Sequence, residues 1–250
     1  LTGASAGIGR ALAGRFAADG GDLILVARRR DALDALAAEL KESHGTSCRV
    51  MVADLADPAA AQTIVGQLAS DGVAVDVVVN NAGFGTLGPV ADLDEQRQAD
   101  MIQVNVMALT RLTRLFLPGM IERRRGGILN VASTAAFQAG PNMAVYYATK
   151  AYVLSFTEAL AEELVGSGVT ATALCPGLTE SEFFDVAGLK GVGLSKIPMA
   201  SAENVAITGH RAFRAGKVIA IHGLSNRLGV QSLRLSPRAV VRKVVKSLQS

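Results

Sequence analysis

Short apolar runs alternate with longer amphipathic segments along most of the chain. Leu23–Ala27 and Val169–Cys175 are largely apolar and of strand length, whereas Asp31–Lys41 carries Leu and Ala at helical spacing. The same criteria predict strands over 23–27, 48–52, 75–80, 127–132, 169–175 and 218–221, and helices over 10–18, 31–41, 58–69, 144–165 and 202–215. They also predict one or two long helices over 95–122 and a shorter helical region over 181–189. Repeated strand–helix units are typical of a parallel sheet with helices on both faces.

This order of elements predicts a single-domain α/β fold, a Rossmann-like doubly wound parallel sheet. A length of 250 residues suits one such domain, and the balance of 50% hydrophobic against 19% charged residues excludes a disordered chain. We expect the first strand to be truncated, because the chain begins at Leu1 without a methionine. Ligands of such sheets bind beyond the carboxyl ends of the strands, so the loops there should carry the chemistry.

The cysteines and histidines give no sign of a disulfide framework or a metal site. Cys48 and Cys175 lie far apart without CxxC spacing, which favours reduced thiols in a cytoplasmic protein. His44, His210 and His222 have no ligand spacing among them, so no metal is expected. No apolar run reaches the 18 residues that would predict a membrane span.

Ser133, Tyr146 and Lys150 form the most distinctive set of reactive side chains. Tyr146 lies thirteen residues after Ser133 and four before Lys150, inside the helix predicted over 144–165. Residues i and i+4 of a helix share one face, with Cβ atoms about 5–6 Å apart, so the ammonium can stabilise a phenolate. The pair is a candidate proton donor and acceptor, although the same spacing also occurs on solvated helix faces.

A glycine-rich loop precedes the first predicted helix. It reads Thr2-Gly3-Ala4-Ser5-Ala6-Gly7-Ile8-Gly9, so the glycines have the spacing T-G-x-x-x-G-x-G. Glycines let the backbone approach a pyrophosphate, whose charge is favoured by the free N–H groups and the dipole of a helix N-terminus. A loop of this kind at the head of a βαβ series indicates dinucleotide binding.

Together these motifs resemble the short-chain dehydrogenase/reductase family, and the resemblance extends through Gly223. After the glycine loop come Asn80-Asn81-Ala82-Gly83, which looks like the N-N-A-G of the family, then Asn105, Ser133, Tyr146-x-x-x-Lys150, and Pro176-Gly177 with Thr179, all in the family's order. Each motif is modest alone, whereas the ordered set is specific.

The resemblance implies hydride transfer between a nicotinamide ring and a carbonyl or alcohol carbon. Tyr146 would exchange the proton, Lys150 would lower the pKa of Tyr146 and hold the nicotinamide ribose, Ser133 would bind the substrate oxygen, and Asn105 would hold a water. The cofactor-binding residues would be Gly3, Ser5, Gly7, Ile8, Gly9, Arg28, Arg29, Asp54, Leu55, Asn81, Ala82, Gly83, Tyr146, Lys150, Pro176, Gly177 and Thr179.

The residues after the strand predicted over 23–27, which corresponds to the second strand of the family, predict NADP(H) as the cofactor. Enzymes that prefer NAD usually place Asp or Glu near the end of this strand, whereas here Ala27 is followed by Arg28 and Arg29. A guanidinium suits a 2′-phosphate, with Arg28 as first contact and Ser5 or Arg29 assisting. The alternative is a solvated basic start to the next helix. For Asp54, contact with the adenine and a turn-forming role are equally compatible with the sequence.

The loops after the later strands predict an apolar substrate site. Around Ser133 and Tyr146 lie Ala135, Ala136, Phe137, Met143 and Val145, and the loop after Pro176 adds Phe183, Phe184 and Met199, with no obvious anion clamp. We expect a hydrophobic ketone, aldehyde or alcohol, although half of these residues could simply be core. The segment 180–199, with Gly188, Gly191 and Gly193, has the composition of a mobile lid.

The C-terminal segment differs chemically from the rest of the chain. All 22 acidic residues lie at or before Glu203, whereas nine of the 25 basic residues follow it. We therefore divide the chain into a catalytic domain, 1–223, and a basic amphipathic C-terminal extension, 224–250, with Val240, Val241, Val244, Val245 and Leu248 at helical spacing. The extension would either dock on its own or a neighbouring subunit, or make peripheral contact with an anionic membrane.

Two alternative functions remain compatible with the sequence. A 3-oxoacyl-[acyl-carrier-protein] reductase would share every motif above, and a non-catalytic NADP-binding regulator or scaffold would need only the cofactor motifs. The run Arg123–Arg125 reads as a helix end rather than a nucleic-acid site, because no aromatic residues are interleaved with it. Long helices like those over 95–122 and 144–165 pair subunits in the family, so the resemblance implies a homo-oligomer, a dimer or tetramer.

Overall fold

The computed structural model describes residues 1–188 and 199–248, without the side chains of residues 184 and 185. Its main strands are β1 (Leu23–Ala27), β2 (Cys48–Val52), β3 (Val77–Asn80), β4 (Gly126–Val131), β5 (Val169–Cys175) and β8 (Ile219–Ile221). The helices that flank them are α1 (Gly7–Ala18), α2 (Arg30–His44), α3 (Ala60–Ser70), α4 (Glu95–Ile102), α5 (Leu109–Glu122), α6 (Ala144–Glu163) and α8 (Ala202–Arg214). The shorter elements are β6 (Thr179–Glu180), α7 (Phe183–Val186), β7 (Ala200–Ser201), α9 (Leu224–Leu233) and α10 (Arg238–Leu248).

Leu1 and Thr2 join the strands into one parallel arrangement. β1 pairs with β2, and β3, β4, β5 and β8 pair in that order, all in parallel. Thr2 forms a parallel bridge to Val26 of β1, and its amide donates to the carbonyl of Val79 in β3 at 2.9 Å. These two residues therefore lie between β1 and β3 and link them.

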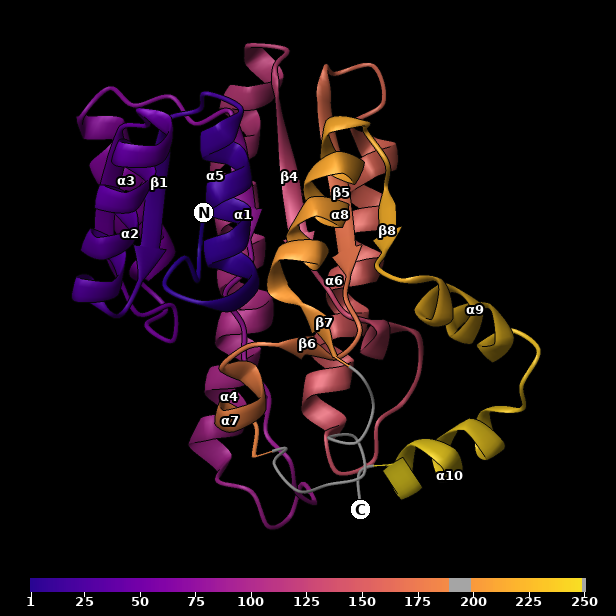
Figure 1. Cartoon of the computed structure of the whole chain (residues 1–250). Helices are drawn as coiled ribbons and strands as arrows, with labels where there is room; N and C mark the ends of the chain where they lie inside the picture. The colour runs from indigo at the N-terminus through magenta and orange to yellow at the C-terminus, as the bar shows by residue number, and fades with distance from the viewer. Residues whose placement is uncertain (189–198, 249–250) are drawn as a thin grey trace.

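Helices cover both faces of the sheet (Figure 1). Successive residues of a strand point to opposite faces of the sheet, so neighbouring side chains pack against different helices. Val79 and Leu129 pack with α1 and α8, whereas Val78 and Ile128 pack with α5 and α6. α2 joins α1 on the first face, and α3 joins α5 on the second. A sheet buried on both faces explains why its strands are apolar without strict alternation.

The predicted elements are confirmed, with boundaries that differ by a few residues. The predicted helix over 95–122 is continuous but consists of α4, a π-helical stretch at Gln103–Ala108, and α5. Within residues 181–188 of the predicted helical region, Phe183–Val186 form α7. Residues 189–198 of the predicted lid, with Gly191 and Gly193, lie outside the described residues. Within residues 224–248 the extension contains two helices, since α9 precedes the predicted helix at α10.

Candidate active site

One cavity of about 1000 Å³ runs along the carboxyl ends of the strands. Two of the predicted site residues, Gly9 and Asn105, are not among those that line it. The predicted residues that do line it are Gly3, Ser5, Gly7, Ile8, Arg28, Arg29, Asp54, Leu55, Asn81, Ala82, Gly83, Ser133, Tyr146, Lys150, Pro176, Gly177 and Thr179. The parallel sheet therefore brings residues from six separate loops to one site.

The glycine loop is held to the loop after β3 by hydrogen bonds. Asn81 Nδ2 donates to the carbonyls of Thr2 and Gly3 at 3.0 and 3.1 Å, and Thr2 Oγ1 accepts from the amides of Asn81 and Ala82 at 3.0 and 3.1 Å. Gly9 packs so closely on this junction that a Cβ atom there would collide with the Gly3 carbonyl and with Asn81 Nδ2. Gly9 therefore shapes the loop from behind rather than lining the cavity.

The start of α1 provides a cradle for an anion. Gly3 and Gly7 have φ angles of +64° and +52°, which favour glycine, and both face the cavity. The N-cap residue Ala6 has no side-chain acceptor, so no side chain caps the first amides of α1. These features fit the pyrophosphate of a dinucleotide.

Arg28 and Arg29, the two arginines after β1, both line the cavity. Arg29 forms hydrogen bonds with Ser5 and Glu182. Arg29 Nη2 donates to Ser5 Oγ at 3.2 Å and to the Ser5 carbonyl at 3.4 Å. Its guanidinium also forms two 2.9 Å hydrogen bonds with the carboxylate of Glu182. Asp54 lines the cavity while Oδ1 accepts from the Ala56 amide at 3.0 Å, so the turn-forming role is present and contact with adenine stays a prediction.

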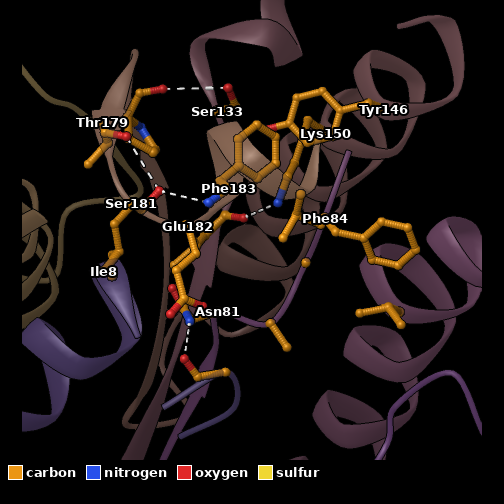
Figure 2. Close-up of a pocket in the computed structure, with 18 of the residues that line it drawn as sticks. Ile8, Asn81, Phe84, Ser133, Tyr146, Lys150, Thr179, Ser181, Glu182 and Phe183 are labelled. Carbon is orange, nitrogen blue, oxygen red and sulfur yellow. Dashed lines mark hydrogen bonds between the residues drawn. The ribbon is translucent and has the colours of Figure 1, made fainter. Parts of the chain in front are cut away.

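Tyr146 and Ser133 meet at the other end of the cavity (Figure 2). Ser133 is fixed because its Oγ accepts from the Ala135 amide at 3.0 Å, as the N-cap of a short 3-10 helix over Thr134–Phe137. Burial raises the pKa of Tyr146 above its usual range, whereas a hydrogen bond with the Ser133 side chain lowers it. The phenol is therefore neutral at physiological pH and able to donate a proton.

Lys150 is buried one helical turn after Tyr146, at the position expected from the spacing. Its Nζ lies 5.9 Å from the centroid of the Tyr146 ring and donates to the carbonyl of Val131 at 2.8 Å. Burial lowers the pKa of Lys150 to about 8, although Cys175 raises it. The Lys150 side chain therefore reaches across to the end of β4, with its ammonium over the Tyr146 ring.

Asn105 supports the site from behind its wall. It is almost fully buried in the π-helical stretch, and Oδ1 accepts from the Phe84 amide at 3.1 Å. Nδ2 donates to the Phe84 carbonyl and to Thr149 Oγ1, both at 3.0 Å. These bonds tie the loop after β3 to α6, beside Gly83 and Lys150. That Asn105 holds a water molecule stays a prediction.

The predicted apolar wall divides between cavity and core. Ala135, Met143 and Phe183 line the cavity, whereas Ala136 and Phe137 pack into the cluster around Val153. Met199 is exposed, and the side chain of Phe184 is outside the described part. The phenol of Tyr146 packs on Phe183, with ring centroids 5.2 Å apart.

Several residues that line the cavity have no local sequence signal. Arg97 of α4 places its guanidinium over the Phe84 ring, 5.3 Å from the centroid, and donates to the Val186 carbonyl at 3.0 Å. No anion clamp is predicted here from the sequence, and the Arg97 guanidinium is already hydrogen-bonded to α7. Other such residues, which come from loops or distant helices, include Phe84, Leu178, Glu182 and Asn226.

The C-terminal extension contributes to the cavity through α9 and α10. Asn226 packs against Gly177, and its Nδ2 donates to the His222 carbonyl at 2.8 Å. Val245 is 5% exposed and lines the cavity with Leu248, whereas the neighbouring Val244 is 54% exposed. The predicted docking of the helix on its own chain is therefore present at Val245, while basic and apolar side chains on its other side stay exposed.

Within 1–188 and 199–248, no helix is long and apolar enough to cross a membrane. Over the same residues, no group of three or more His, Cys, Asp or Glu side chains is placed to hold a metal ion.

Comparison with known proteins places these features in a family. The model of the family described as short chain dehydrogenase matches residues 1–188. A very-long-chain 3-oxoacyl-CoA reductase of Anas platyrhynchos is 35% identical over 183 residues, which are 70% of this chain, and the chain spans only 57% of that relative's length.

Two solved structures are similar over nearly the whole chain. A short-chain dehydrogenase from Sphingobium yanoikuyae in complex with NADPH has a TM-score of 0.84 and 31% identity, covering 94% of this chain and 92% of that one. A 7β-hydroxysteroid dehydrogenase has a TM-score of 0.87 and 26% identity, covering 98% of this chain and 95% of that one.

Proposed function

Because the chain belongs to the short chain dehydrogenase family, we propose that it is an oxidoreductase that transfers hydride between NADP(H) and a carbonyl or alcohol carbon. The observation that carries the proposal is the meeting of Ser133, Tyr146 and Lys150 in the same cavity as the glycine loop. A regulator that only bound the cofactor would have no need of a partly buried phenol next to a buried ammonium.

We propose that the cofactor lies along the cavity from the arginines after β1 to Tyr146. Gly3 and Gly7 would hold its pyrophosphate, Arg28, Arg29 and Ser5 its 2′-phosphate, and Lys150 its nicotinamide ribose. When bound, NADP(H) supplies or accepts the hydride. The NADPH in the Sphingobium yanoikuyae structure supports this choice.

The residues of the chain would manage the proton and the developing charge. In reduction, Tyr146 Oη would donate its proton to the carbonyl oxygen, and Ser133 Oγ would donate a hydrogen bond to the same oxygen. In oxidation, Tyr146 would remove the proton from the alcohol, which requires the phenolate that burial disfavours. The Lys150 ammonium, with a pKa of about 8, is still mostly charged at neutral pH and would stabilise that phenolate across the ring.

We propose an apolar substrate of considerable size. Phe84, Met143, Leu178 and Phe183 line the cavity from the catalytic domain, and α10 adds Val245 and Leu248 from the opposite end of the chain. Apolar walls with a few polar groups at the reacting centre suit a bulky ketone, aldehyde or alcohol. The hydroxysteroid dehydrogenase that matches 98% of the chain has a substrate of this chemical class in its name.

A second candidate is a 3-oxoacyl thioester. The similarity to the 3-oxoacyl-CoA reductase favours it, as do the exposed cations Arg242, Lys243 and Lys246 on the helix that lines the cavity. Anionic carriers such as coenzyme A or an acyl carrier protein would be attracted to that helix.

A substrate panel read by NADPH absorbance tests these proposals. It should contain bulky apolar ketones, aldehydes and alcohols and a 3-oxoacyl-CoA, each with NADP(H) and NAD(H) at equal concentration, with Tyr146→Phe as blank. We expect turnover of at least one apolar compound with NADP(H). A preference for NAD(H) would refute the cofactor, and a wild-type protein that binds NADP(H) but never exceeds the blank would favour the regulator.

The exposed apolar residues also support a proposal on assembly. Ile102 and Met107, from α4 and the π-helical stretch, and Tyr152 of α6 are exposed. We propose that this surface forms a homo-oligomer interface, which size-exclusion chromatography with light scattering would test. The cytoplasmic location stays a prediction.

A further inference from the structure

Glu182, from the segment after β6, forms an ion pair with Arg29, from the loop after β1. The two side chains are 153 positions apart in the sequence and lie at the edge of the same cavity. Both Arg29 Nη atoms donate to the carboxylate, one to each oxygen, at 2.9 Å. The pair is bidentate, which is the strongest geometry available to a guanidinium and a carboxylate.

The carboxylate occupies the face of Arg29 that an incoming phosphate would need. Arg29 Nη2 is already bonded to Ser5, which is proposed to hold the 2′-phosphate together with Arg28 and Arg29. A planar carboxylate and a phosphate use the same pair of parallel N–H groups on a guanidinium. Glu182 is therefore an internal substitute for the anion that Arg29 is proposed to bind.

The same segment also contacts the phosphate cradle. A Cβ atom at Gly7 would lie 2.9 Å from Ser181 Cβ, so Ser181 covers the first turn of α1. Ser181 Oγ in turn accepts from the Phe183 amide at 3.4 Å and donates to the Thr179 carbonyl at the same distance, which fixes the turn before α7. Ser181 and Glu182 thus hold this turn against the cofactor end of the cavity.

The other end of the segment reaches the reaction centre. Phe183 packs on the Tyr146 ring, the Val186 carbonyl accepts from Arg97, and the Ala187 carbonyl accepts from the Leu87 amide at 3.0 Å. Figure 2 shows Ser181, Glu182 and Phe183 between Ile8 of α1 and Tyr146 and Lys150 of α6. One short segment therefore contacts both the proposed phosphate site and the proposed substrate site.

We propose that Glu182 is a specificity-determining residue that competes with the 2′-phosphate for Arg29, so that binding of NADP(H), but not of NAD(H), releases the segment 181–187 from the cofactor end of the cavity. The inference rests on the proposed NADP(H) dependence. A 2′-phosphate carries more negative charge than a carboxylate and can displace it, whereas an unphosphorylated ribose brings no anion to compete. Release of Glu182 would loosen the segment that packs on Tyr146, at the place where substrate must enter.

Calorimetric titration of the full chain with NADP⁺ and NAD⁺ tests the competition. Glu182→Gln should tighten NADP⁺ binding roughly two- to five-fold, the range expected for an exposed ion pair, and leave NAD⁺ binding unchanged. Glu180→Gln is the matched control, since Glu180 is exposed two residues earlier and does not line the cavity, and it should change neither. Arg29→Gln should weaken NADP⁺ binding, and adding Glu182→Gln to it should give no tightening.

Hydrogen exchange supplies a readout that is independent of affinity. At the C-terminal end of α7, the amides of Val186 and Ala187 donate hydrogen bonds to the carbonyls of Glu182 and Phe183. In the wild type, NADP⁺ should speed hydrogen exchange at these two amides, whereas NAD⁺ should not. Unchanged NADP⁺ affinity in Glu182→Gln, or equal tightening of both cofactors, would overturn the competition and leave the cofactor proposal intact. Failure of the wild type to bind NADP⁺ would refute both proposals.

Discussion

The Nζ atom of Lys150 lies 5.9 Å from the centre of the Tyr146 ring and donates its 2.8 Å hydrogen bond to the carbonyl of Val131 at the end of β4. The ammonium is therefore held by the sheet and presented to the face of the phenol ring. Ser133, two residues after Val131, contacts the phenol itself. Strand β4 thus positions both partners of the tyrosine.

Replacement of Tyr146 by Phe should reduce turnover by about 10²- to 10⁴-fold, because the proton donor is lost while the ring stays in place. NADP⁺ affinity measured by calorimetry should change little. Tyr152→Phe is the matched control, since Tyr152 lies on the same helix and bonds Thr110 on the surface. Turnover of Tyr146→Phe within a few-fold of the wild type would refute the assignment.

Gly9→Ala and Gly14→Ala should have opposite effects although both lie in α1. A Cβ atom at Gly9 collides with the Gly3 carbonyl and Asn81 Nδ2, whereas one at Gly14 meets nothing within 4 Å. Gly9→Ala should lower the free energy of unfolding by about 1–3 kcal/mol and impair NADP⁺ binding. Gly14→Ala should raise it by about 0.5–1 kcal/mol through helix propensity. Urea unfolding measures both, and equal effects would contradict the proposed packing of Gly9.

Lys150 should give the protein without cofactor a stability that rises with pH above 8. Its pKa is lowered from 10.5 to about 8 on folding, so between these values the unfolded chain binds more protons than the folded one. Stability then increases with pH across that window, by on the order of 1 kcal/mol between pH 8 and 9. Urea unfolding of the wild type and of Lys150→Met at both pH values isolates this contribution. An identical pH dependence in the two proteins would show that Lys150 is not the group responsible.

Val245→Asp and Val244→Asp should separate the two sides of α10. Val245 is buried at the cavity and Val244 is 54% exposed, so only the first substitution buries an unpaired carboxylate. Val245→Asp should release the helix and speed tryptic cleavage at Arg242, Lys243 and Lys246, whereas Val244→Asp should leave the cleavage rate near that of the wild type. Similar rates in both variants would mean that α10 is not docked through Val245.

The outer side of the extension predicts reversible, salt-sensitive binding to anionic vesicles. Val240 and Val244 are more than half exposed on α10, whose sequence carries four basic and no acidic residues. The full chain should sediment with phosphatidylserine vesicles but not with neutral ones, and Val240→Asp combined with Val244→Asp should abolish this. No sedimentation of the full chain at low salt would remove the membrane hypothesis.

The sequence by itself determined the order of strands and helices, because the strands are short apolar runs and the helices between them carry apolar residues at helical spacing. It also located the glycine loop, Ser133, Tyr146 and Lys150, since their chemistry depends on spacings within one loop or one helix. Arg28 was predicted in the same way as the first contact of a 2′-phosphate, with Arg29 or Ser5 assisting, from the place of the arginines after β1.

Only the tertiary structure decided what those residues face. Glu182 meets Arg29 from 153 positions away, and Val245 reaches the cavity from the far end of the chain. Lys150 donates to a strand carbonyl, and Gly9 supports the glycine loop rather than lining the cavity. Such contacts depend on how separate elements pack around the ends of the sheet, and periodicity within one element carries no information about them.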